Sequence, residues 1–177
     1  SICGYDVLIQ PLEARRRAGY LPEQPPLYPD MTVTEYLRYC CRLRGLKAST
    51  QTAEIARVIE LTGLEAYAHR LSGRLSKGYR QRLGVAQALL GQPPLLILDE
   101  PANHLDLIYQ KHIFSLIEAW LKQPGRAVIS VVHDLSLAKK YGTHAVLMDR
   151  GRCAAQGKTA EVMTRERLEA VYGMDVY

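Results

Sequence analysis

The run "LLILDE", residues 95–100, constrains the fold more than any other stretch of this chain. Its four consecutive aliphatic residues lack the alternation of a half-exposed strand and are typical of an interior strand of a parallel sheet, which is buried on both faces. The run ends in two adjacent carboxylates, Asp99 and Glu100. Because ligands of open α/β sheets bind just beyond the carboxyl ends of the strands, we expect both acids at a ligand-binding edge.

Strand and helix patterns alternate after residue 91, which predicts an α/β protein with a parallel sheet. Strands are expected at residues 94–99, 127–132 and 144–149, and helices near residues 108–121 and 136–140. The sequence "DRGR", residues 149–152, predicts a turn into a last strand, and a terminal helix is expected over residues 164–171. Near the start of the chain, "RRAGYLP" (16–22) predicts one further strand that leads into a loop.

Residues 27–75 are predicted to be mostly helical and contain no convincing strand. Thr32 and Glu35 form a capping box, and apolar residues follow at helical spacing up to Gly45. A second helix is expected over residues 51–62, and a third begins after Ser76 and runs to Leu90. This helical segment has the character of an insertion into the α/β part.

Composition limits the class of protein. Of the 177 residues 47% are apolar and 23% are charged, as in a soluble globular domain with one sizeable core. No apolar stretch is long enough to predict a membrane span. The four cysteines have neither metal-ligand spacing nor the pattern of a disulfide framework, so a reducing cytosol fits best. The net charge of +5 permits an anionic partner without requiring one.

Three stretches have residue types suited to phosphate chemistry. One carboxylate of the pair Asp99 and Glu100 could hold Mg²⁺ while the other polarises a water, although acids also follow strands simply because loops begin there. Ser76, Lys77 and Gly78 open a predicted helix, where an anion site and ordinary capping are both consistent with the sequence. "VISVVHD" ends a β-rich run at a histidine, His133. A lone histidine after a strand is usually structural or merely exposed.

The order of these stretches resembles the ATP-binding subunit of an ABC transporter over the whole chain. "LSKGY" (75–79) is similar to the signature motif of that family, with Lys77 and Tyr79 at the positions of its commonest glycine and glutamine. "LLILDE" resembles the Walker B strand, and His133 resembles the switch histidine. Two further motifs resemble the Q-loop and the D-loop, namely "GYLPE" (19–23) and "NHLD" (103–106).

The resemblance implies a P-loop NTPase fold, in which a parallel-sheet α/β core carries an inserted helical subdomain. Residues 1–177 would form a partial ABC ATPase domain. The nucleotide-binding core would comprise residues 1–26 and 92–177, and the helical subdomain with the signature helix residues 27–91.

The resemblance also implies catalytic roles. Asp99 would hold Mg²⁺ with Glu23, which stands at the usual glutamine position of the Q-loop. Glu100 would orient and deprotonate the attacking water, and His133 would contact the γ-phosphate of ATP. The chain would therefore use ATP and Mg²⁺ as an ATPase.

Other residues would act across a dimer of ATPase subunits, either two copies of this chain or this chain with a paralogue. Ser76, Lys77 and Gly78 would close over the nucleotide of the second subunit, with Lys77 directed either at phosphate or at solvent. Asp106 would cross the dimer interface. A transmembrane permease would be the further partner, placing the protein on the cytoplasmic face of the inner (plasma) membrane, and no nucleic acid is expected.

The loop "QPPLYP" (24–29) is a candidate contact with the permease. It places Leu27 and Tyr28 between prolines, and loop aromatics held by proline make good anchors. In the resembled family this region receives the coupling helix of the transmembrane subunit. We therefore expect Leu27 and Tyr28 to help dock the permease.

The phosphate-cradling pattern G-x-x-x-x-G-K-[ST] occurs nowhere in these residues. The adenine-stacking aromatic of the resembled family is missing as well. Truncation and a degenerate, non-catalytic protein both explain this, and the start at Ser1 favours truncation. On their own, these 177 residues are expected to have neither useful ATP affinity nor activity.

The two halves point to different transporters. Residues 19–37 and 75–90 resemble ATPases of ABC-2 type exporters. Residues 131–157 and 168–176 resemble ATPases of iron–siderophore, haem or cobalamin importers. We expect export, with import as the alternative. A ribosome-associated ABC-F ATPase is a third interpretation, but "DLSLA" follows His133 here, whereas "DRxFL" is usual in that class.

Overall fold

A computed structural model describes residues 1–103 and 105–173 of the chain. The chain divides into two compact units, Ser1–Val131 and Val132–Tyr177, which are described separately below. No helix within the described residues is both long and apolar enough to cross a membrane.

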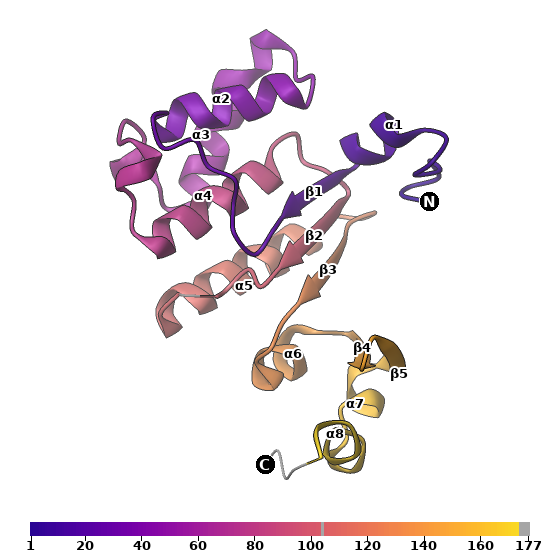
Figure 1. Ribbon diagram of the computed structural model, residues 1–177. Helices are drawn as coiled ribbons and strands as arrows, with labels where there is room; N and C mark the ends of the chain where they lie inside the picture. Colours follow the sequence, from indigo (N-terminus) through magenta and orange to yellow (C-terminus); the bar gives the residue numbers. More distant parts are fainter. Residues whose placement is uncertain (104, 174–177) are drawn as a thin grey trace. The chain divides into compact units, whose positions relative to one another are not determined.

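A three-stranded parallel sheet forms the centre of the first unit (Figure 1). Its strands, in spatial order, are β1 (Ala18–Leu21), β2 (Leu95–Asp99) and β3 (Ala127–Val131). The register places Leu98 of β2 between Leu21 and Ser130. The predicted parallel sheet is confirmed, and "LLILD" is its middle strand.

The two faces of this sheet differ in burial. Leu21, Leu96 and Leu98 lie on one face and are almost completely buried. On the same face, Gly19 lies so close to a following helix that an added Cβ would collide with the Ala88 carbonyl oxygen. The opposite face carries Tyr20 and Ile129, each more than half exposed.

Five α-helices and two 3-10 turns complete the described part of the first unit. Their bounds are α1 (Pro11–Arg16), α2 (Val33–Leu43), α3 (Ala48–Thr62), η1 (Glu65–Tyr67), η2 (Ser72–Arg74), α4 (Lys77–Leu89) and α5 (Leu107–Leu121). Helices α2, α3 and α4 pack on one another, and α4 packs on β1 (Figure 1). The predicted helices are confirmed, whereas α1 was not expected.

Local signals account for where these helices begin and end. The side chain of Thr32 accepts from the Glu35 amide and the Glu35 carboxylate accepts from the Thr32 amide, so the predicted capping box is present. Gly63 ends α3 in the left-handed conformation, with φ 63°. Helix α3 begins at Ala48, three residues before its predicted start. The sequence did not reveal this first turn because the turn is mostly polar and has no apolar periodicity.

The described residues of the second unit, 132–173, form a two-stranded sheet and three helices. Their order is α6 (Leu135–Tyr141), β4 (His144–Asp149), β5 (Arg152–Lys158), α7 (Thr159–Val162) and α8 (Arg165–Tyr172). Its small core gathers Leu147, Val162, Met163 and Leu168.

The pairing of β4 differs from what the strand–helix alternation predicts. Its partner is β5, and the two strands run antiparallel. The cause is a two-residue turn in which both Arg150 (φ 45°) and Gly151 (φ 76°) have positive φ. A turn of this kind matches the twist of a hairpin and brings the chain straight back beside itself.

We predict that Gly19→Ala strongly destabilises the full-length protein. The new Cβ would meet backbone atoms of Ala88 in α4, which cannot move aside as a flexible side chain could. Overpacking of this kind costs about 3 kcal/mol of unfolding free energy, the upper end of its usual range. Urea unfolding measures the loss.

Gly125→Ala is the control for this experiment. Gly125 has φ 76° and open space around it, so its replacement introduces backbone strain without a collision. That strain costs about 1–2 kcal/mol. A Gly19→Ala protein no less stable than the Gly125→Ala protein would contradict the close approach of Gly19 in β1 to Ala88 in α4.

Candidate active site

Glu100 stands at the point where the chain leaves β2, in a tightly bonded turn. Its backbone has φ 49°, in the left-handed region that non-glycine residues seldom adopt. The Glu100 amide donates to the Val131 carbonyl oxygen at 3.0 Å, which ties the turn to the end of β3. The Glu100 carbonyl oxygen accepts from Gln81 Nε2 at 3.1 Å and from the Asn103 amide at 3.0 Å.

A hydrogen bond also orients the Glu100 carboxylate. Asn103 Nδ2 donates to Oε2 of Glu100 at 2.5 Å. The side chain is half-buried, so this oxygen is oriented while the group keeps access to solvent. A carboxylate fixed in this way at the end of a strand can position a water molecule and accept its proton.

Asp99 and Glu23 follow neighbouring strands at the same edge of the sheet. Asp99 is the last residue of β2 and is half-buried, and Glu23 is exposed two residues beyond the end of β1. Since β1 and β2 are parallel, both carboxylates lie at the carboxyl edge, as the sequence predicts.

This edge suits a magnesium ion that is bound partly by phosphates. It suits less well an ion that is bound by protein side chains alone. Within residues 1–103 and 105–173, no three His, Cys, Asp or Glu side chains gather as a metal site. Mg²⁺ bound with a nucleotide typically takes one or two carboxylates and completes its shell with water and phosphate oxygens. Asp99, with Glu23 at the same edge of the sheet, can supply these carboxylates.

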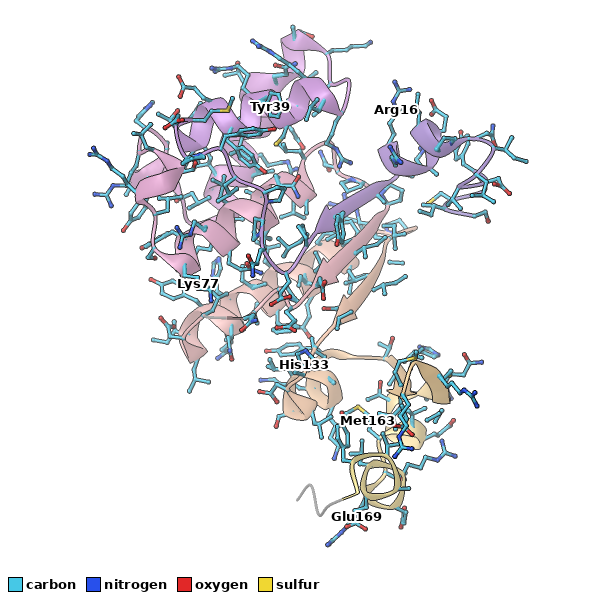
Figure 2. The ribbon with its side chains drawn as sticks, in the orientation of Figure 1. Arg16, Tyr39, Lys77, His133, Met163 and Glu169 are labelled. Atoms are coloured by element: carbon cyan, nitrogen blue, oxygen red, sulfur yellow. The ribbon has the colours of Figure 1, made fainter. Side chains whose placement is uncertain are left out.

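The predicted signature residues open helix α4. Ser76 is its N-cap, and the Ser76 hydroxyl oxygen accepts from the Tyr79 amide at 3.4 Å. Lys77 occupies the first helical position with an exposed side chain (Figure 2), and Gly78 is half-buried. The structure thus shows capping by Ser76 and an exposed cation beside a helix N-terminus.

Asp106 opens helix α5 in the same manner. Its Oδ1 accepts from the amides of Ile108 at 3.1 Å and Tyr109 at 3.0 Å. Leu107 and Ile108, the first two residues of the helix, are 83% and 78% exposed. His104 of the predicted D-loop lies outside the described residues, but the apolar exposure beside Asp106 suits a contact surface.

Aromatic rings and one arginine connect the starts of α4 and α5. The Tyr79 ring lies 3.9 Å from the Tyr67 ring, measured between centroids. The guanidinium carbon of Arg82 lies 4.8 Å from the centroid of the Tyr79 ring and 3.5 Å from that of Tyr109. Arg82 is only 5% exposed.

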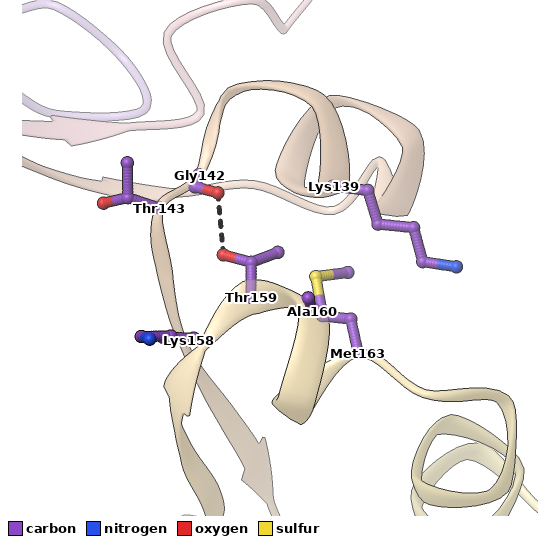
Figure 3. A pocket seen from close by; sticks show the side chains of 7 residues that line it. All are labelled: Lys139, Gly142, Thr143, Lys158, Thr159, Ala160 and Met163. Atoms are coloured by element: carbon purple, nitrogen blue, oxygen red, sulfur yellow. Dashed lines mark hydrogen bonds between the residues drawn. The ribbon is translucent and has the colours of Figure 1, made fainter.

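His133 belongs to the second unit, where it precedes α6 and is exposed (Figure 2). The same unit has a hollow of about 440 Å³ lined by Lys139, Gly142, Thr143, Lys158, Thr159, Ala160 and Met163 (Figure 3). Within it, the Thr159 hydroxyl donates to the Gly142 carbonyl oxygen at 2.7 Å, so this polar group serves the fold. None of the residues predicted for the site lines this hollow.

The loop that was expected to present Leu27 and Tyr28 to a partner folds back in part. The Tyr28 ring meets the Tyr39 ring edge-on with 5.3 Å between centroids, and lies 6.4 Å from the Tyr36 ring. Tyr28 is 47% exposed, and Leu27 is half-buried. The Tyr28 ring therefore packs in part on Tyr36 and Tyr39, and about half of the residue stays exposed.

Sequence reasoning missed the residues that support Glu100. Gln81 is buried in α4, and Asn103 belongs to a motif that was interpreted only as a D-loop. The three-residue spacing between Glu100 and Asn103 was the available signal for a local turn. Nothing local to Gln81 points to a residue 19 positions away.

Comparison with known proteins identifies the family. The profile of the family described as "ABC transporter" matches residues 6–103, more than half of the chain. The chain belongs to the ABC transporter family. Its fold class, an α/β P-loop NTPase fold with a parallel sheet, is confirmed.

Several ATP-binding proteins of ABC transporters are similar over most of this chain. The molybdenum import ATP-binding protein ModC 1 of Azotobacter vinelandii is 35% identical over 161 residues, 91% of this chain and 44% of its own length. The iron(3+)-hydroxamate import ATP-binding protein FhuC of Bacillus subtilis is 34% identical over 159 residues, 88% of this chain and 59% of its own length. The chain spans about half the length of such relatives.

Solved structures of ABC proteins share the fold. An ATP-binding subunit of an ABC transporter superposes with a TM-score of 0.81 at 28% identity, covering all of this chain and 71% of its own. A dimeric bacterial ABC transporter cassette, MJ0796, gives a TM-score of 0.78 at 23% identity, covering 88% and 68% of the two chains.

We predict an unusually weak acid at Tyr79. The hydrogen bond with the Tyr67 side chain, together with burial, raises the pKa of Tyr79 to about 12. In the Tyr67→Leu protein the pKa should fall back toward the ordinary value near 10. Ultraviolet absorbance during an alkaline titration follows the phenolate, and subtraction of the Tyr79→Phe curve isolates this residue among the 11 tyrosines.

The raised pKa also has a consequence for stability. The neutral phenol is favoured in the folded state, so its stabilising contribution is complete below the unfolded pKa near 10. It is lost as the pH rises through about 12. A Tyr79 that titrates near 10 with Tyr67 intact would contradict the stacked geometry.

Proposed function

We propose that this chain is part of an ATP-binding subunit of an ABC transporter that hydrolyses ATP to power transport through a membrane permease. The observation that supports this most strongly is the Glu100 carboxylate, held by Asn103 at the carboxyl end of the middle strand. A general base needs this combination of fixed direction and access to water. Because similar members of the matched family are described as ATP-binding proteins, we propose ATP as the substrate.

In the proposed mechanism, Glu100 orients a water molecule toward the γ-phosphate of ATP and takes its proton. Asp99 and Glu23 provide oxygen ligands at the same edge, where Mg²⁺ would offset the charge of the phosphates. His133 contacts the γ-phosphate. The phosphate-cradling loop that holds the rest of the nucleotide is not among these 177 residues, so we expect them to be inactive alone.

The active unit we propose is a dimer of ATPase subunits, either two copies or two paralogues. The dimeric cassette MJ0796 supports this, since it shares the fold. Ser76, Lys77 and Gly78 act on the nucleotide of the second subunit, and Asp106 crosses the interface. The exposed Lys77 adds a positive charge there or faces solvent.

The permease is the second proposed partner, which would place the subunit on the cytoplasmic face of the inner membrane. A solved relative of the same fold is described as cbiO1, part of the ABC transporter complex cbiONQ. Leu27 keeps its proposed role in docking, together with the exposed part of Tyr28. We propose no nucleic-acid partner.

We predict that Glu100→Gln in the full-length protein keeps ATP binding and loses most hydrolysis. The amide cannot accept a proton, while Asp99 and the phosphate loop keep their contacts with the nucleotide. A positioned acid–base group contributes a factor of about 10²–10⁴ in rate. Phosphate release gives the rate, and titration calorimetry gives the affinity for Mg-ATP.

Glu118→Gln is the matched control, because it makes the same change at an exposed position of α5. Its rate should equal that of the wild type. Hydrolysis by Glu100→Gln at the wild-type rate would remove Glu100 from the mechanism. A full-length wild-type protein without any ATPase activity would overturn the proposed function itself.

Export is the proposed direction of transport, on the resemblance of residues 19–37 and 75–90 to ABC-2 exporters. Import is the second candidate. The similar molybdenum and iron-hydroxamate proteins, both described as import ATP-binding proteins, favour it. The permease, rather than the ATPase fold, selects the cargo.

If the protein serves export, cells that lack its gene should take up radiolabelled molybdate and iron-hydroxamate at the wild-type rate, since neither would be its cargo. Complementation with the wild-type gene and with the Glu100→Gln gene provides the controls. Loss of either uptake that only the wild-type gene restores would show import and contradict the proposed direction.

A further inference from the structure

The starts of α4 and α5 are built in the same way. At α4, the Ser76 side chain accepts from the amide of Tyr79, three residues later. At α5, the Asp106 side chain accepts from the amide of Tyr109, also three residues later. Each capping residue is therefore bonded to the backbone of a tyrosine.

Both tyrosine rings lie against the same arginine. Arg82 is flanked by the rings of Tyr79 and Tyr109, at 4.8 and 3.5 Å from their centroids. Its Nη1 donates to the Gly63 carbonyl oxygen at 3.4 Å, which holds the guanidinium between the rings. Gly63 leaves room for this contact, because a Cβ there would lie 3.2 Å from Nη1.

The stack is anchored at one end and open at the other. Beyond Tyr79 it continues to Tyr67 of η1, and Arg70 lies 5.3 Å from the centroid of the Tyr67 ring. At the other end, Tyr109 is 37% exposed, whereas Arg82 is 5% exposed. The Arg82 guanidinium is thus held by the Gly63 carbonyl oxygen and the Tyr79 ring. Helix α5 contacts it through the Tyr109 ring.

We propose that Arg82 is a positioning residue that clamps the start of α4 to the start of α5. The proposal rests on the proposed function, in which Ser76 and Asp106 both face the second ATPase subunit. The clamp adds a direct link between the two helix starts to the longer connection from Gln81 through the turn at Glu100. With it, a dimer contact made at one of them orders the other, so the two contacts form together.

A purely structural role for Arg82 is the competing explanation, and Tyr109 separates the two. Because Tyr109 contacts Arg82 from the exposed end of the stack, its replacement should leave the fold intact. The test uses the full-length Glu100→Gln protein, which binds ATP without turning it over. Sedimentation with Mg-ATP measures the dimer dissociation constant.

Tyr109→Leu should weaken the ATP-dependent dimer by up to about ten-fold, because one cation–π contact can couple the two helix starts by no more than its own energy. Tyr109→Phe keeps the ring and should dimerise as its parent does. The affinity of the monomer for Mg-ATP should stay unchanged in both, while the urea midpoint should fall slightly for Tyr109→Leu because the monomer loses the same contact. Equal dimerisation of the Leu and Phe proteins, or a weakening that comes with a lower affinity of the Leu monomer for Mg-ATP, would overturn the clamp.

A double-mutant cycle excludes a direct contact between Tyr109 and the second subunit. If Tyr109 acts through Arg82, Arg82→Met with Tyr109→Leu should weaken the dimer no more than Tyr109→Leu does alone. Additive losses would overturn the proposal. A Glu100→Gln parent that forms no dimer with Mg-ATP would instead refute the proposed function, and the clamp with it.

Discussion

The left-handed turn at Glu100 is the constraint on which the candidate active site depends. A non-glycine residue in this conformation costs about 1–2 kcal/mol, so the surroundings must hold it there. They do so through the Val131 carbonyl oxygen of β3, Gln81 of α4 and Asn103 of the following turn. The carboxylate therefore takes its direction from three separate segments of the chain.

Helix α4 connects this turn to the remainder of the first unit. It can approach the sheet because Gly19 of β1 and its own Gly84 have no Cβ, which would collide with Ala88 and with Leu21 respectively. The close approach brings Gln81 within reach of Glu100, while the next residue, Arg82, points into the stack between Tyr79 and Tyr109. One helix thus serves the proposed catalytic edge and the proposed dimer surface.

The sequence predicted what depends on neighbouring residues. The strand that ends at Asp99, the capping box of Thr32 and the cap at Ser76 were all visible as local patterns, and the structure contains them. It could not predict the hydrogen bond from Gln81 to Glu100 or the packing of Tyr28 on Tyr39, because these contacts arise only after distant segments pack together. The roles assigned to individual site residues remain predictions.

The two departures from the commonest signature sequence differ in their physical basis. The side chain of Lys77 is exposed, and its own unit gives no packing reason for a lysine there. Tyr79, in contrast, has a ring neighbour on one side in Tyr67 and a cation on the other in Arg82. Glutamine at this position would leave the Tyr67 ring without its stacking partner. The presence of tyrosine at residue 79 thus follows from the aromatic residue at 67, and arginine suits residue 82 better than lysine because only a planar guanidinium stacks on both rings.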